Sequence, residues 1–322
     1  MKKNRIFVCV IIIAALLVVG FGIYAALHKE ASEEKIRIGV LRTADSIPIY
    51  VAEQEKIFEK YGVQVELVEF GSASEQSKAM EAEAIDVMMT DMIVECFLKK
   101  GGTDVRTIRT ALGSEVSEGK FIIAASPNSD IESIEDLEGA SVAISENTMM
   151  EFLVDSYCDE LSMERSKLEK VSIPGLSLRY ETVMEGKDVE CAILPEPLGD
   201  YAVMNGAKSI IDDTTLDNNY SISVIVASKK LTDDAELTGK FTEAYDEAVE
   251  LLNESPDDYK ELILEVANVP DDMRDNYEVC KYPENKVPSE EEVKRVVAWM
   301  REKELIQKEY EYDDIVDNSF LR

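Results

Sequence analysis

Short apolar runs alternate with longer amphipathic stretches over most of the sequence, and this alternation is the feature that most limits the possible folds. It is typical of β-α-β units, in which helices connect parallel strands and cover the sheet. In the first set of such units, helices are predicted at about 47 to 60, 72 to 83 and 92 to 100. The predicted strands of this set are KIRIGVL, VQVELVEF, AIDVMM, VRTIRTAL and KFIIAAS.

A second set of nearly equal size follows the first. Its helices are predicted at about 148 to 161, 176 to 186 and 197 to 205. One more strand, YSISVIVAS, comes before a part that is predicted to be helical from Thr232 almost to Lys303. The strands of the second set itself are SVAIS, EKVSI, ECAIL and AKSII.

The late strand YSISVIVAS indicates that the chain returns to its first half. The four strands of the second set already have their connecting helices, so a fifth strand followed only by helices fits better beside the first set. We therefore predict an α/β fold of two lobes joined by two crossing strands, near residues 121 to 126 and 221 to 228, with a helical C-terminal part. A cleft between such lobes can open and close by hinge motion. The predicted boundaries are 1–35 for an N-terminal segment with its linker, 36–122 and 225–322 for lobe 1, and 123–224 for lobe 2.

The N-terminal segment is predicted to be a membrane or targeting element. MKKNR is followed by 22 uncharged residues at 6–27, which are enough to cross a hydrocarbon core of about 30 Å. The basic residues before this run place the start of the chain in the cytoplasm and the rest outside the membrane. Because no clean A-x-A-like cleavage site follows, we favour an uncleaved anchor. A cleaved signal, which would leave a secreted or periplasmic protein, is the alternative.

Charge and residue usage exclude several classes of function. With 66 acidic and 34 basic residues the net charge is −32, which repels nucleic-acid phosphates. The only histidine is His28, in the linker, so a Ser-His-Asp or Cys-His arrangement lacks its base, and neither an enzyme nor a cofactor is predicted.

No C-x-x-C pair occurs among Cys96, Cys158, Cys191 and Cys280, so these cysteines do not indicate a metal site. An extracytoplasmic location permits disulfides between them, in any of three connectivities.

Four segments occur in the order and spacing of a known family. They are KIRIGVLRTADSIPIYVAEQEKIFEKYGVQVELVEF, EAIDVMMTDM, IEDLEGASVAIS and ECAILPEPLGDYAVMNGAK. Over roughly residues 36 to 300, the chain resembles the SsuA/THI5-like (NMT1-like) substrate-binding proteins of ABC importers. The resemblance implies a type II periplasmic-binding-protein fold that closes on a small molecule and delivers it to a permease driven by an ATPase. Members of the family bind nitrate, alkanesulfonates, taurine, aromatic acids or thiamine-precursor pyrimidines. The resemblance therefore indicates the fold and the role of the protein more closely than it indicates the ligand.

In such a fold, the loops that follow the strands line the cleft. Small polar residues and free backbone N–H groups ahead of helices can donate hydrogen bonds to a ligand there. Ser46, Ser72, Asp91 and Thr148 also suit a purely structural role as helix N-caps. The predicted ligand-binding residues are Thr43, Asp45, Ser46, Gly71, Ser72, Thr90, Asp91, Ser145, Glu146, Asn147, Thr148 and Glu196.

The charges of these loop positions bear on the class of ligand. Four of the positions are acidic and none is Lys or Arg, and carboxylates beside a bound anion oppose its binding. We therefore favour an amine-bearing or nitrogen-heterocyclic ligand, such as a thiamine-precursor pyrimidine. A sulfonate- or nitrate-type anion is the alternative, for which Arg42 or Arg179 would supply the positive charge. A membrane-anchored ligand-sensing domain of the same fold is a second alternative, of another class.

Overall fold

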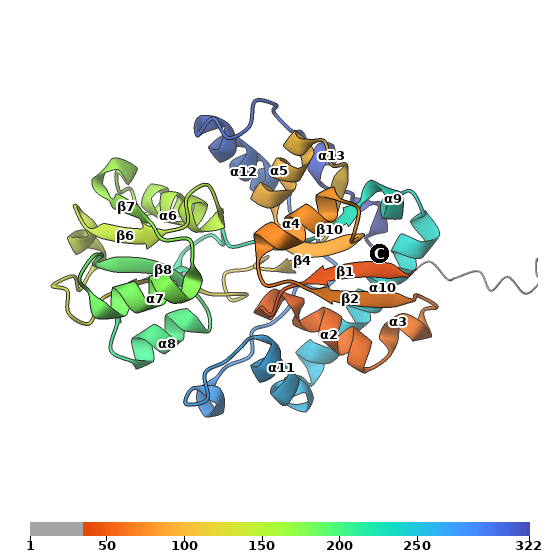
Figure 1. Cartoon of the computed structure of the whole chain (residues 1–322), viewed down its shortest axis with the longest axis horizontal. Helices are drawn as coiled ribbons and strands as arrows, with labels where there is room; N and C mark the ends of the chain where they lie inside the picture. The colour runs from red at the N-terminus through yellow and green to blue at the C-terminus, as the bar shows by residue number, and fades with distance from the viewer. Residues whose placement is uncertain (1–34) are drawn as a thin grey trace, which may run out of the picture.

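The computed structural model describes residues 35–322, which form two five-stranded sheets flanked by helices (Figure 1). The segment predicted to enter the membrane, residues 6–27, lies outside the described residues, whether it is an anchor or a signal. Between residues 35 and 322, no helix is both long enough and apolar enough to cross a bilayer.

The first sheet has the strand order β2-β1-β3-β10-β4, with β1 parallel to β2 and β3, and β10 antiparallel to both of its neighbours. The helix predicted over 47–60 is two helices, because Lys56 adopts a left-handed conformation with φ of 56°. The strands are β1 (Ile36–Val40), β2 (Val65–Glu69), β3 (Val87–Asp91), β4 (Val105–Leu112) and β10 (Ser223–Ser228). The helices that connect them are α2 (Ile47–Gln54), α3 (Ile57–Lys60), α4 (Ala73–Glu81) and α5 (Met92–Gly101).

The second sheet has the order β7-β6-β8-β5-β9, and its lobe lies on the left in Figure 1. Strand β6 is parallel to β7 and β8, whereas β5 is antiparallel to β8 and β9. The strands are β5 (Phe121–Ala125), β6 (Ser141–Ile144), β7 (Glu169–Ser172), β8 (Cys191–Pro195) and β9 (Lys208–Asp212). The helices of this lobe are α6 (Met149–Glu160), α7 (Leu176–Glu185) and α8 (Leu198–Met204).

The C-terminal part packs mainly on the first sheet, but it is less continuous than predicted. No α-helix lies between residues 267 and 289, where a nearly unbroken helical run was expected. The α-helices are α9 (Lys229–Thr232), α10 (Ala235–Glu254), α11 (Lys260–Val266), α12 (Glu290–Glu302) and α13 (Tyr312–Ile315). Short 3-10 helices are η1 (Ala44–Ser46), η2 (Ile134–Leu137), η3 (Arg165–Lys167), η4 (Asp213–Thr215), η5 (Pro256–Tyr259), η6 (Arg274–Asn276) and η7 (Asn318–Phe320).

The chain passes between the sheets through two loops rather than through strands. The strands expected to cross, near 121 to 126 and 221 to 228, each lie within one sheet: β5 pairs only in the second and β10 only in the first. The crossings are residues 113–120 and 213–222. Loops make these crossings because a strand can hydrogen-bond along its length only while it stays within one sheet.

The two crossing loops are pressed against each other. Gly113 has a φ of 84°, and a Cβ atom there would lie 2.5 Å from the carbonyl oxygen of Ser221, so the close approach requires glycine. The Asn219 side-chain amide donates to the carbonyl oxygens of Glu115 at 2.8 Å and Glu118 at 3.1 Å. The connection between the sheets is therefore a paired, hydrogen-bonded unit.

Helix α12 makes a second contact between the lobes. It packs on α5 and also reaches α6 of the second lobe, where the Trp299 ring meets the Phe152 ring edge-on at 5.5 Å. The Trp299 indole N–H donates to Asp155 at 3.0 Å, and Lys303 pairs with Glu151. The buried apolar side chains of α5, α6 and α12 accordingly belong to one cluster that spans both sheets.

A buried ion pair attaches α10 to the first sheet. Arg109 on β4 and Asp246 on α10 are joined at 2.9 Å, and their side chains are 1% and 4% exposed. Arg109 also donates to the carbonyl oxygen of Phe320, near the end of the chain. Removing one partner of such a pair leaves an uncompensated buried charge, which costs several kcal/mol.

We predict that Asp246→Asn lowers the free energy of unfolding by about 3 kcal/mol, because Arg109 loses its buried counter-ion. Urea unfolding followed by circular dichroism measures this change. Glu247→Gln is the matched control, since the neighbouring Glu247 pairs with Lys60, whose side chain is 62% exposed; it should cost less than about 1 kcal/mol. Equal effects of the two substitutions would contradict the prediction.

Candidate functional site

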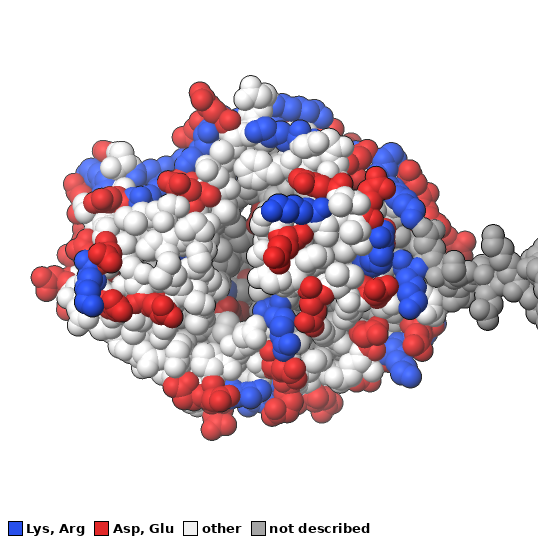
Figure 2. Space-filling view, viewed as in Figure 1, with Lys and Arg blue, Asp and Glu red and all other residues white. Residues whose placement is uncertain are grey.

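The two sheets present the carboxyl ends of their parallel strands to each other. Strands β1 and β3 of the first sheet and β6 and β8 of the second end on this side, because the crossing from β4 to β5 joins the two sheets across it. Figure 2 shows a hollow groove between the lobes at this position. Open α/β sheets bind ligands beyond the carboxyl ends of their strands, so this groove is the candidate site.

The loop after β1 contributes a hydrogen-bonded wall. The Thr43 hydroxyl donates to Asp45 at 2.6 Å, and burial raises the pKa of the Asp45 carboxyl above its ordinary value. Ser46 is completely buried, and its side chain makes no capping bond to α2, so the predicted role as a cap is wrong. The Ser46 backbone is helical, with φ of −86° and ψ of −13°, because η1 (Ala44–Ser46) runs directly into α2, whereas a capping residue is typically extended.

Thr90 and Asp91 end β3, and Asp91 directly precedes α5. One Asp91 oxygen accepts the backbone N–H groups of Ile93 at 2.8 Å and Val94 at 2.9 Å, which confirms the predicted N-cap. Burial raises the pKa of Asp91, and the nearby Asp45 carboxyl raises it further. The structure thus brings the Asp45 carboxyl close enough to Asp91 to raise the pKa of Asp91.

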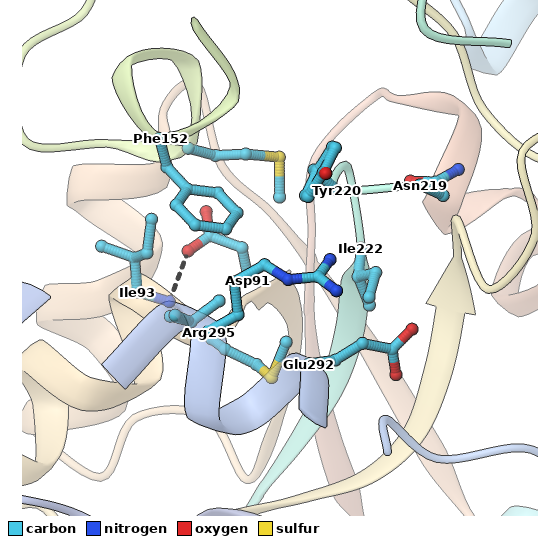
Figure 3. Close-up of a pocket in the computed structure, with 11 residues that line it drawn as sticks. Asp91, Ile93, Phe152, Asn219, Tyr220, Ile222, Glu292 and Arg295 are labelled. Atoms are coloured by element: carbon cyan, nitrogen blue, oxygen red, sulfur yellow. Dashed lines mark hydrogen bonds between the residues drawn. The ribbon is translucent and has the colours of Figure 1, made fainter. Parts of the chain in front are cut away.

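Asp91 also lines a narrow pocket between the lobes that the sequence prediction missed. Its walls include Met149 and Phe152 from α6, Tyr220 from the second crossing, and Arg295 from α12. The Arg295 guanidinium lies 4.7 Å from the centre of the Tyr220 ring, a cation–π arrangement that Figure 3 shows with Phe152 and Asp91 nearby. Because this pocket joins four segments distant in sequence, local pattern could not have predicted it.

The loop after β6 supplies four of the predicted residues, and two of them shape the start of α6. The Thr148 hydroxyl accepts the Met150 N–H at 3.2 Å, which confirms its predicted role as an N-cap. Asn147 has a φ of 59°, and its N–H donates to Glu151. Glu146 and Asn147 are exposed, and Ser145 is partly exposed, so their side chains remain accessible at this edge.

Gly71 and Ser72 lie at the exposed edge of the first sheet, after β2. The Ser72 hydroxyl accepts the Glu75 N–H at 3.3 Å, so Ser72 is the N-cap of α4, as predicted. The Gly71 N–H is already bonded to the Glu75 carboxylate at 3.2 Å. Both of these groups are thus engaged within their own loop.

Glu196, at the end of β8, lies between the lobes. One of its carboxyl oxygens is buried without a hydrogen-bond partner. Burial, together with the nearby Asp200 carboxylate, raises the pKa of Glu196 to about 7, although Lys120 opposes the shift. The Glu196 carboxylate also raises the pKa of the Tyr277 hydroxyl in the C-terminal part, so Glu196 faces the first lobe.

Arg179 is the most unusual charge near the groove, and it was not among the predicted site residues. It lies in the first turns of α7, after β7, and is only 2% exposed. One guanidinium N–H donates to the carbonyl oxygen of Ile173 at 3.2 Å, whereas Nε is buried and has no partner. Burial lowers the pKa of Arg179 to about 10.

The sequence model of the family described as NMT1/THI5 like matches residues 43–259, which is more than half of the 322 residues. The chain belongs to the NMT1/THI5-like family. The resemblance inferred from four sequence segments is thereby confirmed.

The NMT1/THI5-like protein has relatives among binding proteins. It is 22% identical over 330 residues to a Bacillus subtilis (strain 168) protein assigned as an aliphatic sulfonates-binding protein, with 100% of this chain and 96% of that one covered. The periplasmic aliphatic sulphonate binding protein SsuA of Escherichia coli matches with a TM-score of 0.72 and 18% identity, covering 89% of this chain and 92% of that one. A ligand-binding component of an ABC-type import system from Staphylococcus aureus matches with a TM-score of 0.70 and 15% identity, covering 88% and 97%. These structural matches confirm the predicted periplasmic-binding-protein fold.

The same fold also occurs in an enzyme. The desulfurization enzyme DSZB matches with a TM-score of 0.67 and 12% identity, over 89% of this chain and 97% of that one. The fold alone therefore does not separate binding from catalysis. The Bacillus subtilis, Escherichia coli and Staphylococcus aureus proteins described above carry the names of binding proteins, whereas DSZB carries that of an enzyme.

The cysteines and acidic residues form neither disulfides nor a metal site in the part of the chain that the structure describes. Cys96, Cys158, Cys191 and Cys280 are all free, so none of the three connectivities occurs. Within residues 35–322, no three His, Cys, Asp or Glu side chains are arranged to hold a metal ion.

We predict a pH dependence of stability from Glu196. Its pKa is about 7 when folded and near 4.5 ordinarily, so the folded chain binds its proton more tightly and loses stability as the pH rises from about 4.5 to 7. Glu196→Gln removes this contribution, so relative to the variant the parent should lose on the order of 3 kcal/mol across that range. Urea unfolding of both proteins at several pH values measures it, and parallel stability curves would contradict the prediction.

Proposed function

We propose that this protein is the substrate-binding component of an ABC importer, held at the outer face of the membrane. It captures a small organic molecule between its two lobes and delivers it to the permease, whose transport is driven by the ATPase. The observation that carries the proposal is the pair of facing sheet edges, where one carboxyl oxygen of Glu196 and the Nε atom of Arg179 are buried without a hydrogen-bond partner. Such groups are costly unless a ligand satisfies them.

Organic sulfonates are the proposed class of ligand. The names of the Bacillus subtilis and Escherichia coli relatives support it. Burial raises the pKa values of Asp45, Asp91 and Glu196 and so favours their neutral forms. Because a neutral carboxyl does not repel a bound anion, these residues oppose sulfonate binding less than ionised carboxylates would. A protonated carboxyl can donate a hydrogen bond to a sulfonate oxygen.

An amine or nitrogen heterocycle is the second candidate. The Glu196 carboxyl favours it, because a cation or a ring N–H would supply the hydrogen-bond donor that its free oxygen lacks. A sensing domain that reports the ligand to a membrane partner would use the same cleft. The two roles differ in the partner protein and not in the ligand site.

We predict that a sulfonate stabilises the full chain, purified in a mild detergent, against heating. A ligand at a hundred times its Kd adds about 2.7 kcal/mol to the free energy of unfolding, which is a rise of about 5 °C in Tm. A thermal-shift panel of ethanesulfonate, benzenesulfonate, ethylamine and 4-aminopyrimidine measures this. A shift with the last two compounds alone supports the second candidate, and Asp45→Asn should then weaken it. No shift with any of them would count against both.

We also predict that binding changes the fluorescence of Trp299, the only tryptophan of the chain. Its indole lies at the contact between α12 and α6, where the Asp155 and Phe152 side chains of the second lobe touch it. Movement of the lobes alters this environment. Titration of ethanesulfonate into the parent protein should shift the emission, and Trp299→Phe should remove the signal without preventing binding. An unchanged spectrum under saturating ligand would contradict lobe movement at this contact.

A further inference from the structure

The start of α7 is equipped to receive an anion. The helix has ten residues and follows β7 at the edge of the second sheet that faces the groove. Its N-cap is Gly175, which has no side chain to bind the first N–H groups, and its first turn contains no acidic residue. Free N–H groups and the positive end of the helix dipole favour a negative charge at such a position.

Arg179 provides an independent observation at the same place. Helical side chains lean toward the helix N-terminus, and the bond from Arg179 to the Ile173 carbonyl oxygen shows that the guanidinium lies back over the loop before α7. Nε is buried and unpartnered. No acidic side chain of residues 35–322 forms a salt bridge with Arg179.

The other buried cation of the described chain does have a counter-ion. Arg109 is as buried as Arg179 and is paired with Asp246 at 2.9 Å. Asp155, 3% exposed, is paired with Lys170. A buried charge without a counter-ion is expensive to keep, and Arg179 still carries its charge at neutral pH because its pKa, although lowered by burial, is about 10. The missing counter-ion is therefore best supplied from outside the chain.

We propose that Arg179 and the first N–H groups of α7 bind the oxyanion head of the ligand, a sulfonate or a carboxylate. This inference rests on the proposed binding function and deepens it. The guanidinium offers planar paired donors to two oxygens, and the backbone N–H groups reach the third oxygen of a sulfonate. Leu176 and Leu178 of the same helical turns are 37% and 58% exposed, which suits an organic anion with an apolar tail rather than an inorganic one.

The first test is calorimetric titration of the full chain with ethanesulfonate, propionate and ethyl phosphate, which distinguish the three head groups. Arg179→Gln should weaken binding of the preferred anion about 100-fold, since truncating one partner of a buried charge pair has an effect of this size. Arg179→Lys keeps the charge but loses the paired donors, and it should give an intermediate loss. Lys187→Gln is the matched control, because it removes one positive charge from an exposed side chain just after the same helix and should leave the affinity unchanged.

The second test separates a ligand site from a structural role. In the absence of ligand, Arg179→Met should raise the Tm by about 2 °C, because it removes an uncompensated buried charge and keeps the length of the side chain. If Arg179 served mainly to hold the loop at Ile173, the Tm should fall instead. A fall in Tm would overturn the inference.

The outcomes also separate this inference from the proposed function. If ethanesulfonate binds the parent and Arg179→Gln equally well, the head-group site is wrong and the binding function stands. If only ethylamine or 4-aminopyrimidine binds the parent, the inference is overturned and the second class of ligand is supported. If none of the probes binds, both the inference and the sulfonate proposal are contradicted.

Discussion

The contact between the two crossing loops is the constraint on which the rest of the structure depends. Gly113 lies against the Ser221 backbone so closely that no side chain fits between them, and Asn219 bonds the second crossing to the first. This contact sets how the carboxyl edges of the two sheets face each other. The positions of Asp45, Asp91 and Glu196 follow from it, since each lies at or just after the carboxyl end of a strand at one of those edges.

Two cations are buried in the described chain, and only one of them is paired. Arg109 is joined to Asp246 within the first lobe. Around the groove, a buried cation at Arg179 and a buried carboxyl at Glu196 both lack a complete set of partners. Groups left unsatisfied in this way are typical of binding sites, where stability is sacrificed for function.

The sequence was sufficient to predict the two α/β lobes, because the period of the apolar residues marks most of their strands and helices locally. It did not predict the loop crossings or the gap in the C-terminal helices between residues 267 and 289. Ser72, Asp91 and Thr148 were correctly predicted as caps, since the signal for a cap lies within four residues. The pocket that contains Phe152 and Tyr220 joins segments far apart in the chain, so no local pattern indicates it. The sequence offered Arg42 and Arg179 alike as the positive charge for an anion, and only the burial of Arg179 and its missing counter-ion distinguish the two.

The strand pairing of the second sheet has a consequence for how such a molecule is assembled. Ile122, near the start of β5, is paired with Asp212, the last residue of β9, so this sheet begins and ends on neighbouring strands. A segment whose two ends lie side by side can be inserted into a host fold, or replaced by another segment of its kind, without disturbing the host's strand order. Recombination at this pair of positions would exchange the half of the groove that includes Arg179 and Glu196 while keeping the half that includes Asp45 and Asp91. The fold is thus suited to acquiring new ligands by substitution of one whole lobe.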